Sequence, residues 1–150
     1  MDLEYLEKRD KNLIVIMAVD EKNGMMFHQR RQSQDRILRE KILAMAEGKR
    51  LWMNAYSYRQ FEQSAEKAIS VAEDFLDSAK NGEYCFVENV SVKAYEEKIE
   101  KLILFRWNRR YPGDQFLDID LAEKSWKLEH TEEFPGSSHE KITMEEYKHE

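Results

Sequence analysis

The feature that most constrains the fold is an almost unbroken apolar run near the start of the chain, at residues 13–19. Consecutive apolar side chains on a strand point to both faces of the sheet, so both faces must be covered. The run therefore predicts a central strand with helices on both sides. A turn follows from Asp20 to Gly24, and residues 25–34 show no clear periodicity and are expected to form a loop.

Helical periodicity begins after this loop. Apolar residues recur at steps of three and four from Leu38 to Met45, which predicts an amphipathic helix. Either Ser33 or Asp35 can cap its first turn, because both side chains accept hydrogen bonds from free main-chain N–H groups. Gly48 is expected to end the helix, since glycine takes positive φ freely.

A second apolar stripe runs from Tyr58 to Ala79 at helical spacing, without a glycine or proline between residues 55 and 81. It predicts one continuous helix over residues 57–80. The rival signal is Ser-Val-Ala-Glu at residues 70–73, which fits a capping box and can begin a second helix.

The remaining elements are short. Apolar or aromatic runs predict strands at 50–53, 84–87 and 101–107, a brief helix at 92–98 and two antiparallel strands after Trp126. Strands that alternate with helices and end in a hairpin indicate an α/β sandwich with a mostly parallel sheet of about six strands. The strand at 50–53 is expected near an edge, where free main-chain groups could pair with a second copy.

Composition limits the partners. The net charge is −6 and 36% of the residues are charged, so the chain is expected to repel nucleic acid and anionic membranes. No apolar run approaches the roughly 20 residues that a membrane helix needs. Residues 1–11 form a polar extension without the order of a signal peptide, which leaves one domain at 12–150. The lone Cys85 cannot form an internal disulfide, and a buried, inert thiol fits the cytoplasm.

Histidines give no sign of a functional site. They lie at His28, His130, His139 and His149. They lack the i, i+4 spacing of a helical metal site and are distant in sequence from Cys85, so no metal is expected. A Ser, His and acid triad lacks the glycines of a nucleophile elbow. Solvated surface histidines are therefore expected.

Three segments resemble the dihydrofolate reductase family. Residues 13–25, with Asn-Gly-Met at their end, resemble its first strand and the loop over its substrate. Residues 48–54, Gly-Lys-Arg-Leu-Trp-Met-Asn, resemble its second strand. Residues 111–126, which begin Tyr-Pro-Gly-Asp and end at a tryptophan, resemble its closing part. The resemblance covers about residues 12–148 and implies a dihydrofolate-reductase-like three-layer sandwich, NADPH as cofactor and dihydrofolate as substrate.

The resemblance assigns four positions to the cofactor, Ala18, Gly24, Ser57 and Ser91, but much of the surrounding cofactor site has changed. In the family's phosphate-binding segment after the second strand, only the hydroxyl survives, at Ser57, and the arginine is absent. The family's Gly-Gly pair beside the pyrophosphate is replaced by Glu-Asn-Val-Ser at residues 88–91. The two strands that hold the adenosine end also have no counterpart in the sequence.

The substrate side has changed as well. The family's acidic residue on the first helix falls at Leu38, with Ile42 at an apolar substrate contact. Phe105 replaces a threonine that supports the acid. The resemblance leaves Asp35 and Glu40 as candidate catalytic acids, and either needs a shift of register to take that place.

Two arginines, Arg30 and Arg31, lie near the mouth of the implied cleft and can bind an anion by paired hydrogen bonds, although ordinary solvated charge is the alternative. The changed positions predict a non-catalytic binding or interaction module without a cofactor. Its partner would be a small anionic molecule, another protein or a second copy of the chain. The alternative is an active NADPH-dependent dihydrofolate or pteridine reductase with a rearranged site.

Overall fold

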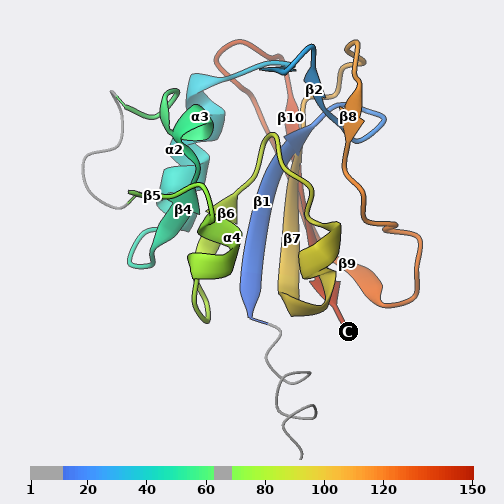
Figure 1. Cartoon of the computed structure of the whole chain (residues 1–150). Helices are drawn as coiled ribbons and strands as arrows, with labels where there is room; N and C mark the ends of the chain where they lie inside the picture. Colours follow the sequence, from blue (N-terminus) through green and yellow to red (C-terminus); the bar gives the residue numbers. More distant parts are fainter. Residues whose placement is uncertain (1–11, 63–68) are drawn as a thin grey trace, which may run out of the picture.

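A computed structural model describes residues 12–62 and 69–150, which are organised around a seven-stranded sheet (Figure 1). The strand order is β5-β4-β6-β1-β7-β10-β9, and β1 is central, as predicted. The first five strands are parallel, and β10 is antiparallel to both of its neighbours. The bounds are β1 Leu13–Val19, β4 Leu51–Met53, β5 Ile69–Val71, β6 Tyr84–Phe86, β7 Ile99–Arg106, β9 Trp126–Phe134 and β10 Ile142–His149. The predicted α/β sandwich with a terminal hairpin is confirmed.

A small antiparallel sheet lies above the carboxyl end of β1 (Figure 1). It consists of β3 (Arg30–Arg31), β2 (Gly24–Phe27) and β8 (Gln115–Phe116), in that order. The region predicted as a loop therefore contains a hairpin. Its two turn residues, His28 and Gln29, have φ of 50° and 62°. Positive φ at both turn positions is the requirement of a type I′ hairpin turn.

Helix α2 (Arg36–Met45) forms where the sequence predicts it. The carboxylate of Asp35 accepts hydrogen bonds from the main-chain N–H groups of Ile37 and Leu38 and so caps the first turn. After the helix, the chain turns through Gly48, whose φ is +83°. The remaining helical segments are short: α3 (Ala55–Tyr58), α4 (Phe75–Ser78) and a 3-10 helix, η1 (Lys93–Lys98).

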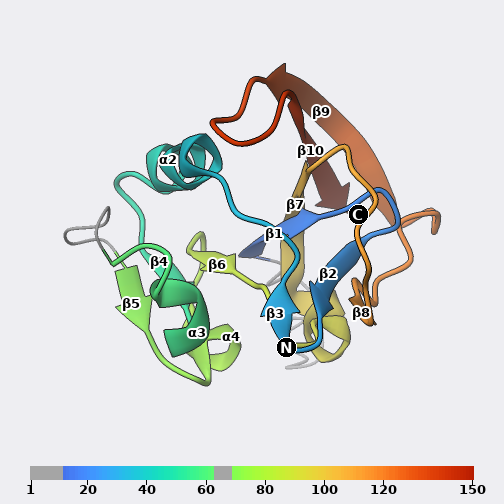
Figure 2. The same ribbon diagram turned by 90° about the horizontal axis from the view of Figure 1, so that it is seen from above.

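Alternate residues of β1 enter two separate hydrophobic cores, one on each face of the sheet. Ile14 and Ile16 pack in the same cluster as α2. Val15 and Met17 pack in the cluster that contains Phe75 of α4. Figure 2 shows α2 on one side of the sheet and α4 on the other. The apolar run in β1 is therefore explained by burial on both faces.

The prediction of one helix over residues 57–80 is wrong. Residues 63–68 lie outside the described residues, but α3 ends at Tyr58 and residues 69–71 form a strand. Phe61 packs in the core beside α2, whereas Phe75 packs in the core on the opposite face. A single straight helix could not bury both side chains, so tertiary packing overrides the local helical period.

The predicted edge of the sheet is also corrected. Strand β5 pairs with β4 through all three of its residues, so the strand at 51–53 is covered and β5 is the edge. The resemblance implied that both of the family's edge strands are missing, whereas one strand is present here. It makes the sheet seven-stranded rather than six-stranded. Pairing satisfies the main-chain groups that β4 would otherwise leave free.

Cys85 on β6 is fully buried, as predicted, and burial raises the pKa of its thiol to about 12. None of the helices within residues 12–62 and 69–150 is long and apolar enough to cross a membrane.

Candidate functional site

In a parallel sheet of this kind, ligands are expected at the carboxyl ends of β1 and β6, a position referred to as the β1–β6 crevice. The chain leaves β1 toward α2 on one face of the sheet, and it leaves β6 toward η1 on the other (Figure 2). In open parallel sheets, such a change of direction leaves a crevice at the carboxyl ends of the strands, and ligands bind there. The side chains that follow β1 and β6 therefore decide what this crevice can hold.

An ion pair of the protein's own bridges this crevice. Arg31, on β3, donates from Nε to Glu88 Oε2 at 2.9 Å and from Nη2 to Glu88 Oε1 at 3.1 Å. Glu88 lies two residues beyond β6, and its side chain is only 7% exposed, against 21% for Arg31. Two parallel hydrogen bonds between a guanidinium and a carboxylate are a strong and directional arrangement. The segment after β1 is thus joined to the segment after β6.

Tyr56, at the start of α3, completes this bridge. The guanidinium of Arg31 lies 4.5 Å from the centre of the Tyr56 ring and donates to the Tyr56 carbonyl oxygen at 3.3 Å. The Tyr56 hydroxyl in turn accepts from the main-chain N–H of Arg31 at 2.8 Å. Burial lowers the pKa of Arg31, but Glu88 raises it by more, so the pKa stands above its ordinary value. Arg31 is therefore charged, and it is held by the Glu88 carboxylate, the Tyr56 ring and the Tyr56 carbonyl oxygen.

A second link joins the carboxyl ends of β4 and β6. Asn54 Nδ2 donates to Asn89 Oδ1 at 2.8 Å, and Asn54 Oδ1 accepts from the Ser57 N–H at 3.1 Å. Ser57 is buried, and its hydroxyl has no hydrogen-bond partner within the described part of the chain. The hydroxyl that the resemblance assigns to a phosphate is therefore unpaired, beside two linked amides.

The other predicted cofactor residues make separate local contacts. Ala18 is half-buried in β1 opposite Phe105 of β7. Gly24 is closely packed, since a Cβ there would lie 2.6 Å from Gln32 Nε2. Ser91 donates a short hydrogen bond to Asp118. Their role in cofactor binding stays a prediction.

The predicted substrate-cleft residues fall into two groups. Leu38, Ile42 and Phe105 are 3%, 1% and 1% exposed and pack in one hydrophobic cluster. They therefore contribute to the core. The two arginines differ in their contacts. Arg31 is paired with Glu88, whereas Arg30 is exposed and forms no ion pair with any described residue.

A cavity of about 480 Å³ lies beside Arg30. Its lining consists of Phe27, His28, Arg30, Arg31, Gln32, Tyr111 and Pro112. The rings of Phe27 and His28 stack with their centres 3.8 Å apart. The side-chain oxygen of Gln32 is buried without a hydrogen-bond partner among residues 12–62 and 69–150. The cavity therefore offers an aromatic surface, together with a cation and an amide oxygen that have no partner among the described residues.

The surroundings of the two candidate catalytic acids, Asp35 and Glu40, do not favour donation of a proton to a substrate. Burial raises the pKa of Asp35, but hydrogen bonds from His139, Ser138 and Ser137 outweigh it and hold the pKa well below its usual range. A carboxylate stabilised in this way does not supply a proton near neutral pH. Glu40 is exposed on α2 and pairs with Arg36 at 3.0 Å. Neither contact places a proton donor beside the β1–β6 crevice.

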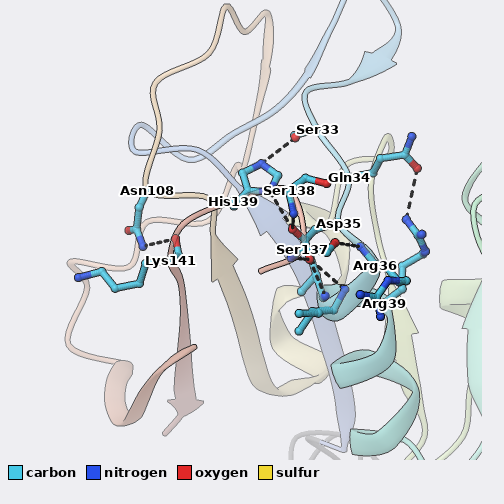
Figure 3. Close-up of polar contacts among 12 residues, drawn as sticks. Ser33, Gln34, Asp35, Arg36, Arg39, Asn108, Ser137, Ser138, His139 and Lys141 are labelled. Carbon is cyan, nitrogen blue, oxygen red and sulfur yellow. Dashed lines mark hydrogen bonds and ion pairs between the residues drawn. The ribbon is translucent and has the colours of Figure 1, made fainter. Parts of the chain in front are cut away.

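Sequence reasoning missed a polar cluster around His139 (Figure 3). His139 Nδ1 lies 3.0 Å from Asp35 Oδ2, and Nε2 lies 2.9 Å from Ser33 Oγ and 3.3 Å from the Tyr111 hydroxyl. Because the ionised carboxylate of Asp35 only accepts, Nδ1 donates to it, and Nε2 is the ring nitrogen that faces both hydroxyls. The expectation of solvated histidines is wrong for His139 and His149, each 7% exposed.

A larger cavity, of about 630 Å³, lies beside Trp107. It is lined by Trp107, Asn108, Arg109, Glu133, Phe134, Pro135, Glu140 and Lys141. The Trp107 ring stacks on His139 with the ring centres 4.4 Å apart. Asn108 donates to the Lys141 carbonyl oxygen at 3.0 Å, which joins the two segments that line this cavity (Figure 3). No described group of three or more His, Cys, Asp or Glu residues could hold a metal ion.

No family model and no curated protein sequence matches this chain. Its fold is nevertheless similar to a solved structure, a dihydrofolate reductase from Enterococcus faecalis complexed with NADP(H) and RAB-propyl. The TM-score is 0.65 at 12% sequence identity, and the match covers 93% of this chain and 97% of that one. At this identity the likeness establishes the fold alone, and it agrees with the central β1 and the terminal antiparallel strands. The chain has a dihydrofolate-reductase-like fold.

Proposed function

We propose that this chain does not carry out NADPH-dependent reduction and acts as a binding or interaction module on the dihydrofolate reductase scaffold. The observation that carries the proposal is the Arg31–Glu88 pair across the β1–β6 crevice. Glu88 puts a carboxylate where the resemblance expects glycine beside a pyrophosphate. The fold's usual ligand position is therefore bridged by an ion pair of the protein, whose carboxylate would repel a phosphate.

The energetic penalty for a cofactor follows from this geometry. A phosphate about 4 Å from a carboxylate is repelled by about 1 kcal/mol even in water. Opening the bridge also breaks two charge-assisted hydrogen bonds, each of which contributes about 1.5–3 kcal/mol. The sum is at least about 4 kcal/mol, and this difference turns micromolar binding into millimolar binding.

The direct test is an assay of NADPH oxidation with dihydrofolate as substrate, with an active dihydrofolate reductase as positive control. We expect no turnover above the rate without enzyme, and no rise in melting temperature with NADPH. A cofactor at a hundredfold excess over its Kd would stabilise the fold by about 2.7 kcal/mol. Saturable turnover by the wild-type chain would contradict the proposal.

One observation favours the alternative, an active reductase with a rearranged site. The Ser57 hydroxyl is buried and unpaired among the described residues, at the position that the resemblance assigns to phosphate. Replacing Ser57 by alanine separates the two functions. If the chain binds NADPH through this hydroxyl, S57A should weaken the binding, whereas a chain without a cofactor site should give the same null result before and after the substitution.

The cavity beside Arg30 is the proposed position for a small anionic ligand. Arg30 supplies a guanidinium without an ion-pair partner in the described part of the chain, and the stacked Phe27 and His28 rings supply an aromatic wall. Anilinonaphthalene sulfonate, an aromatic anion, is a suitable fluorescent probe. We expect R30A to weaken its binding and R59A, at another exposed arginine, to leave it unchanged. Equal loss in both variants would contradict a specific site.

The sequence also leads us to expect a protein partner or a second copy of the chain. A protein partner or a second copy remains a prediction, and sedimentation of the purified chain measures the second of these. We propose a cytoplasmic location, because the lone Cys85 is a buried thiol that needs no oxidising compartment.

A further inference from the structure

Ser33, His139 and Asp35 are joined in the order of a nucleophile, a base and an orienting acid. Ser33 Oγ lies 2.9 Å from His139 Nε2, and His139 Nδ1 lies 3.0 Å from Asp35 Oδ2 (Figure 3). These distances are within the reach of hydrogen bonds that activate a serine. Such a site is recognised by geometry and not by the order of its residues in the chain.

The imidazole of His139 is held in one orientation by contacts on its edge and on its face. Asp35 already holds the turn through the main-chain N–H groups of Ser137 and Ser138, at 3.0 and 2.7 Å. The same carboxylate fixes the tautomer of His139, and Trp107 covers one face of the imidazole at an angle of 26° between the rings. Nε2 is therefore left as an acceptor directed at the Ser33 hydroxyl, and the imidazole is preorganised.

Ser33 lines neither of the two cavities described above, but residues in contact with its base or next to it line both. Trp107, which stacks on the base, lines the larger cavity. Tyr111, the second partner of Nε2, lines the smaller one together with Gln32, the neighbour of Ser33. Ser33 is itself partly exposed. Phe134 and Pro135 give the larger cavity an apolar wall, which fits a short acyl chain.

We propose that Ser33 is an activated nucleophile that accepts the acyl group of small carboxylic esters. Its Oγ attacks the carbonyl carbon, and its proton passes to His139 Nε2. The bond to the alcohol oxygen then breaks, and the alcohol leaves with that proton. Water then attacks the carbonyl carbon of the acyl-serine and gives a proton to Nε2. The bond from that carbon to Ser33 Oγ breaks, Oγ takes the proton from Nε2, and the carboxylic acid leaves. This reaction goes beyond the proposed binding function and uses none of the residues in the β1–β6 crevice.

Tyr111 is the side-chain donor placed to stabilise the negative oxygen in this reaction. Its hydroxyl lies 3.3 Å from His139 Nε2, next to the Ser33 hydroxyl on the same nitrogen. Rotation of the O–H toward the attacked carbonyl supplies a hydrogen bond that grows stronger as charge develops.

The test is covalent labelling of the full-length chain with a fluorophosphonate, followed by intact mass and peptide mapping. We expect one label, on Ser33. S33A should remove it, and H139Q should slow it by about 10²-fold or more, the usual contribution of a general base. The matched control is S78A, because Ser78, at the end of α4, donates to Asp74 at 3.3 Å and forms no hydrogen bond with a histidine in the described part of the chain. It should be labelled like the wild type.

Melting temperatures keep the result interpretable. S33A retains the His139–Asp35 contact and should melt like the wild type. The absence of label on folded S33A would therefore identify Ser33 as the reactive residue, even if H139Q fails to fold. An unlabelled wild-type chain that melts cooperatively would overturn the proposal. Labelling that persists in S33A, or that is equally fast in urea, would overturn it as well. Hydrolysis of p-nitrophenyl acetate with an initial burst, absent in S33A, gives an independent readout.

Discussion

Replacing Arg31 by methionine should destabilise the protein more than replacing Glu88 by glutamine. In R31M, the Glu88 carboxylate stays buried, with its side chain 7% exposed, and loses its counter-ion. Breaking a buried pair in this way costs about 3–5 kcal/mol. In E88Q, the amide oxygen still accepts one hydrogen bond, and the more exposed Arg31 retains its position over Tyr56. The expected cost of E88Q is about 1–2 kcal/mol.

The coupling between the two residues follows from the same contacts. The pair has two charge-assisted hydrogen bonds, of 2.9 and 3.1 Å. Each contributes about 1.5–3 kcal/mol, and the desolvation of both charges offsets part of the sum. We expect a double-mutant cycle to give a coupling energy of about 3 kcal/mol.

The assay is urea unfolding of the wild type, both single variants and the double variant. With an m value of about 2 kcal/mol/M, R31M should lower the midpoint by about 1.5–2.5 M without changing m. The matched control is the Arg36–Glu40 pair on α2, whose side chains are 61% and 57% exposed. Its cycle should give about 0.3–0.5 kcal/mol. A coupling at Arg31–Glu88 no larger than this, or an E88Q that costs more than R31M, would refute the reasoning.

Three further predictions concern stability and reactivity. The pKa of Asp35 is lower in the folded protein than in the unfolded chain, so the ionised carboxylate stabilises the fold above about pH 4 and loses this contribution as the pH falls. The urea midpoint of D35N should therefore be lower than that of the wild type at pH 7. Below pH 4, the midpoint of D35N should fall less steeply than the midpoint of the wild type. G136A should cost about 1–3 kcal/mol, because a Cβ there would lie 2.5 Å from Asp35 Oδ2 and 3.0 Å from the His139 carbonyl oxygen; an unchanged midpoint would contradict this packing. Cys85 should react with a thiol reagent at pH 8 only after unfolding, because burial raises its pKa to about 12; rapid reaction of the folded chain would contradict its burial.

The sequence predicts the parts of the fold that depend on local patterns. The run at residues 13–19 is apolar at every position that faces either core, and its place at the centre of the sheet follows. Helix α2 has both a period and a cap, so its start at Arg36 was predictable. The helix over 57–80 was not, because Phe61 and Phe75 belong to opposite faces of the sheet and no local pattern carries that information.

Both polar sites depend on contacts between distant segments. Glu88 differs visibly from the pattern of the resembled family, but 57 positions separate it from Arg31, and the hairpin of β2 and β3 brings the two together. Ser33 and His139 are 106 positions apart. Side-chain spacing identifies sites on one helix or in one loop, and it gives no signal when a turn between β9 and β10 folds onto the start of α2.

Calorimetric titration of the wild-type chain with NADPH tests the central claim most directly. The Arg31–Glu88 bridge must open before a pyrophosphate can reach the carboxyl end of β6. We expect no saturable heat below about 1 mM NADPH, in line with a loss of at least about 4 kcal/mol of binding free energy. Saturation at tens of micromolar with one site per chain would contradict the claim and would show that this fold still binds a nicotinamide cofactor.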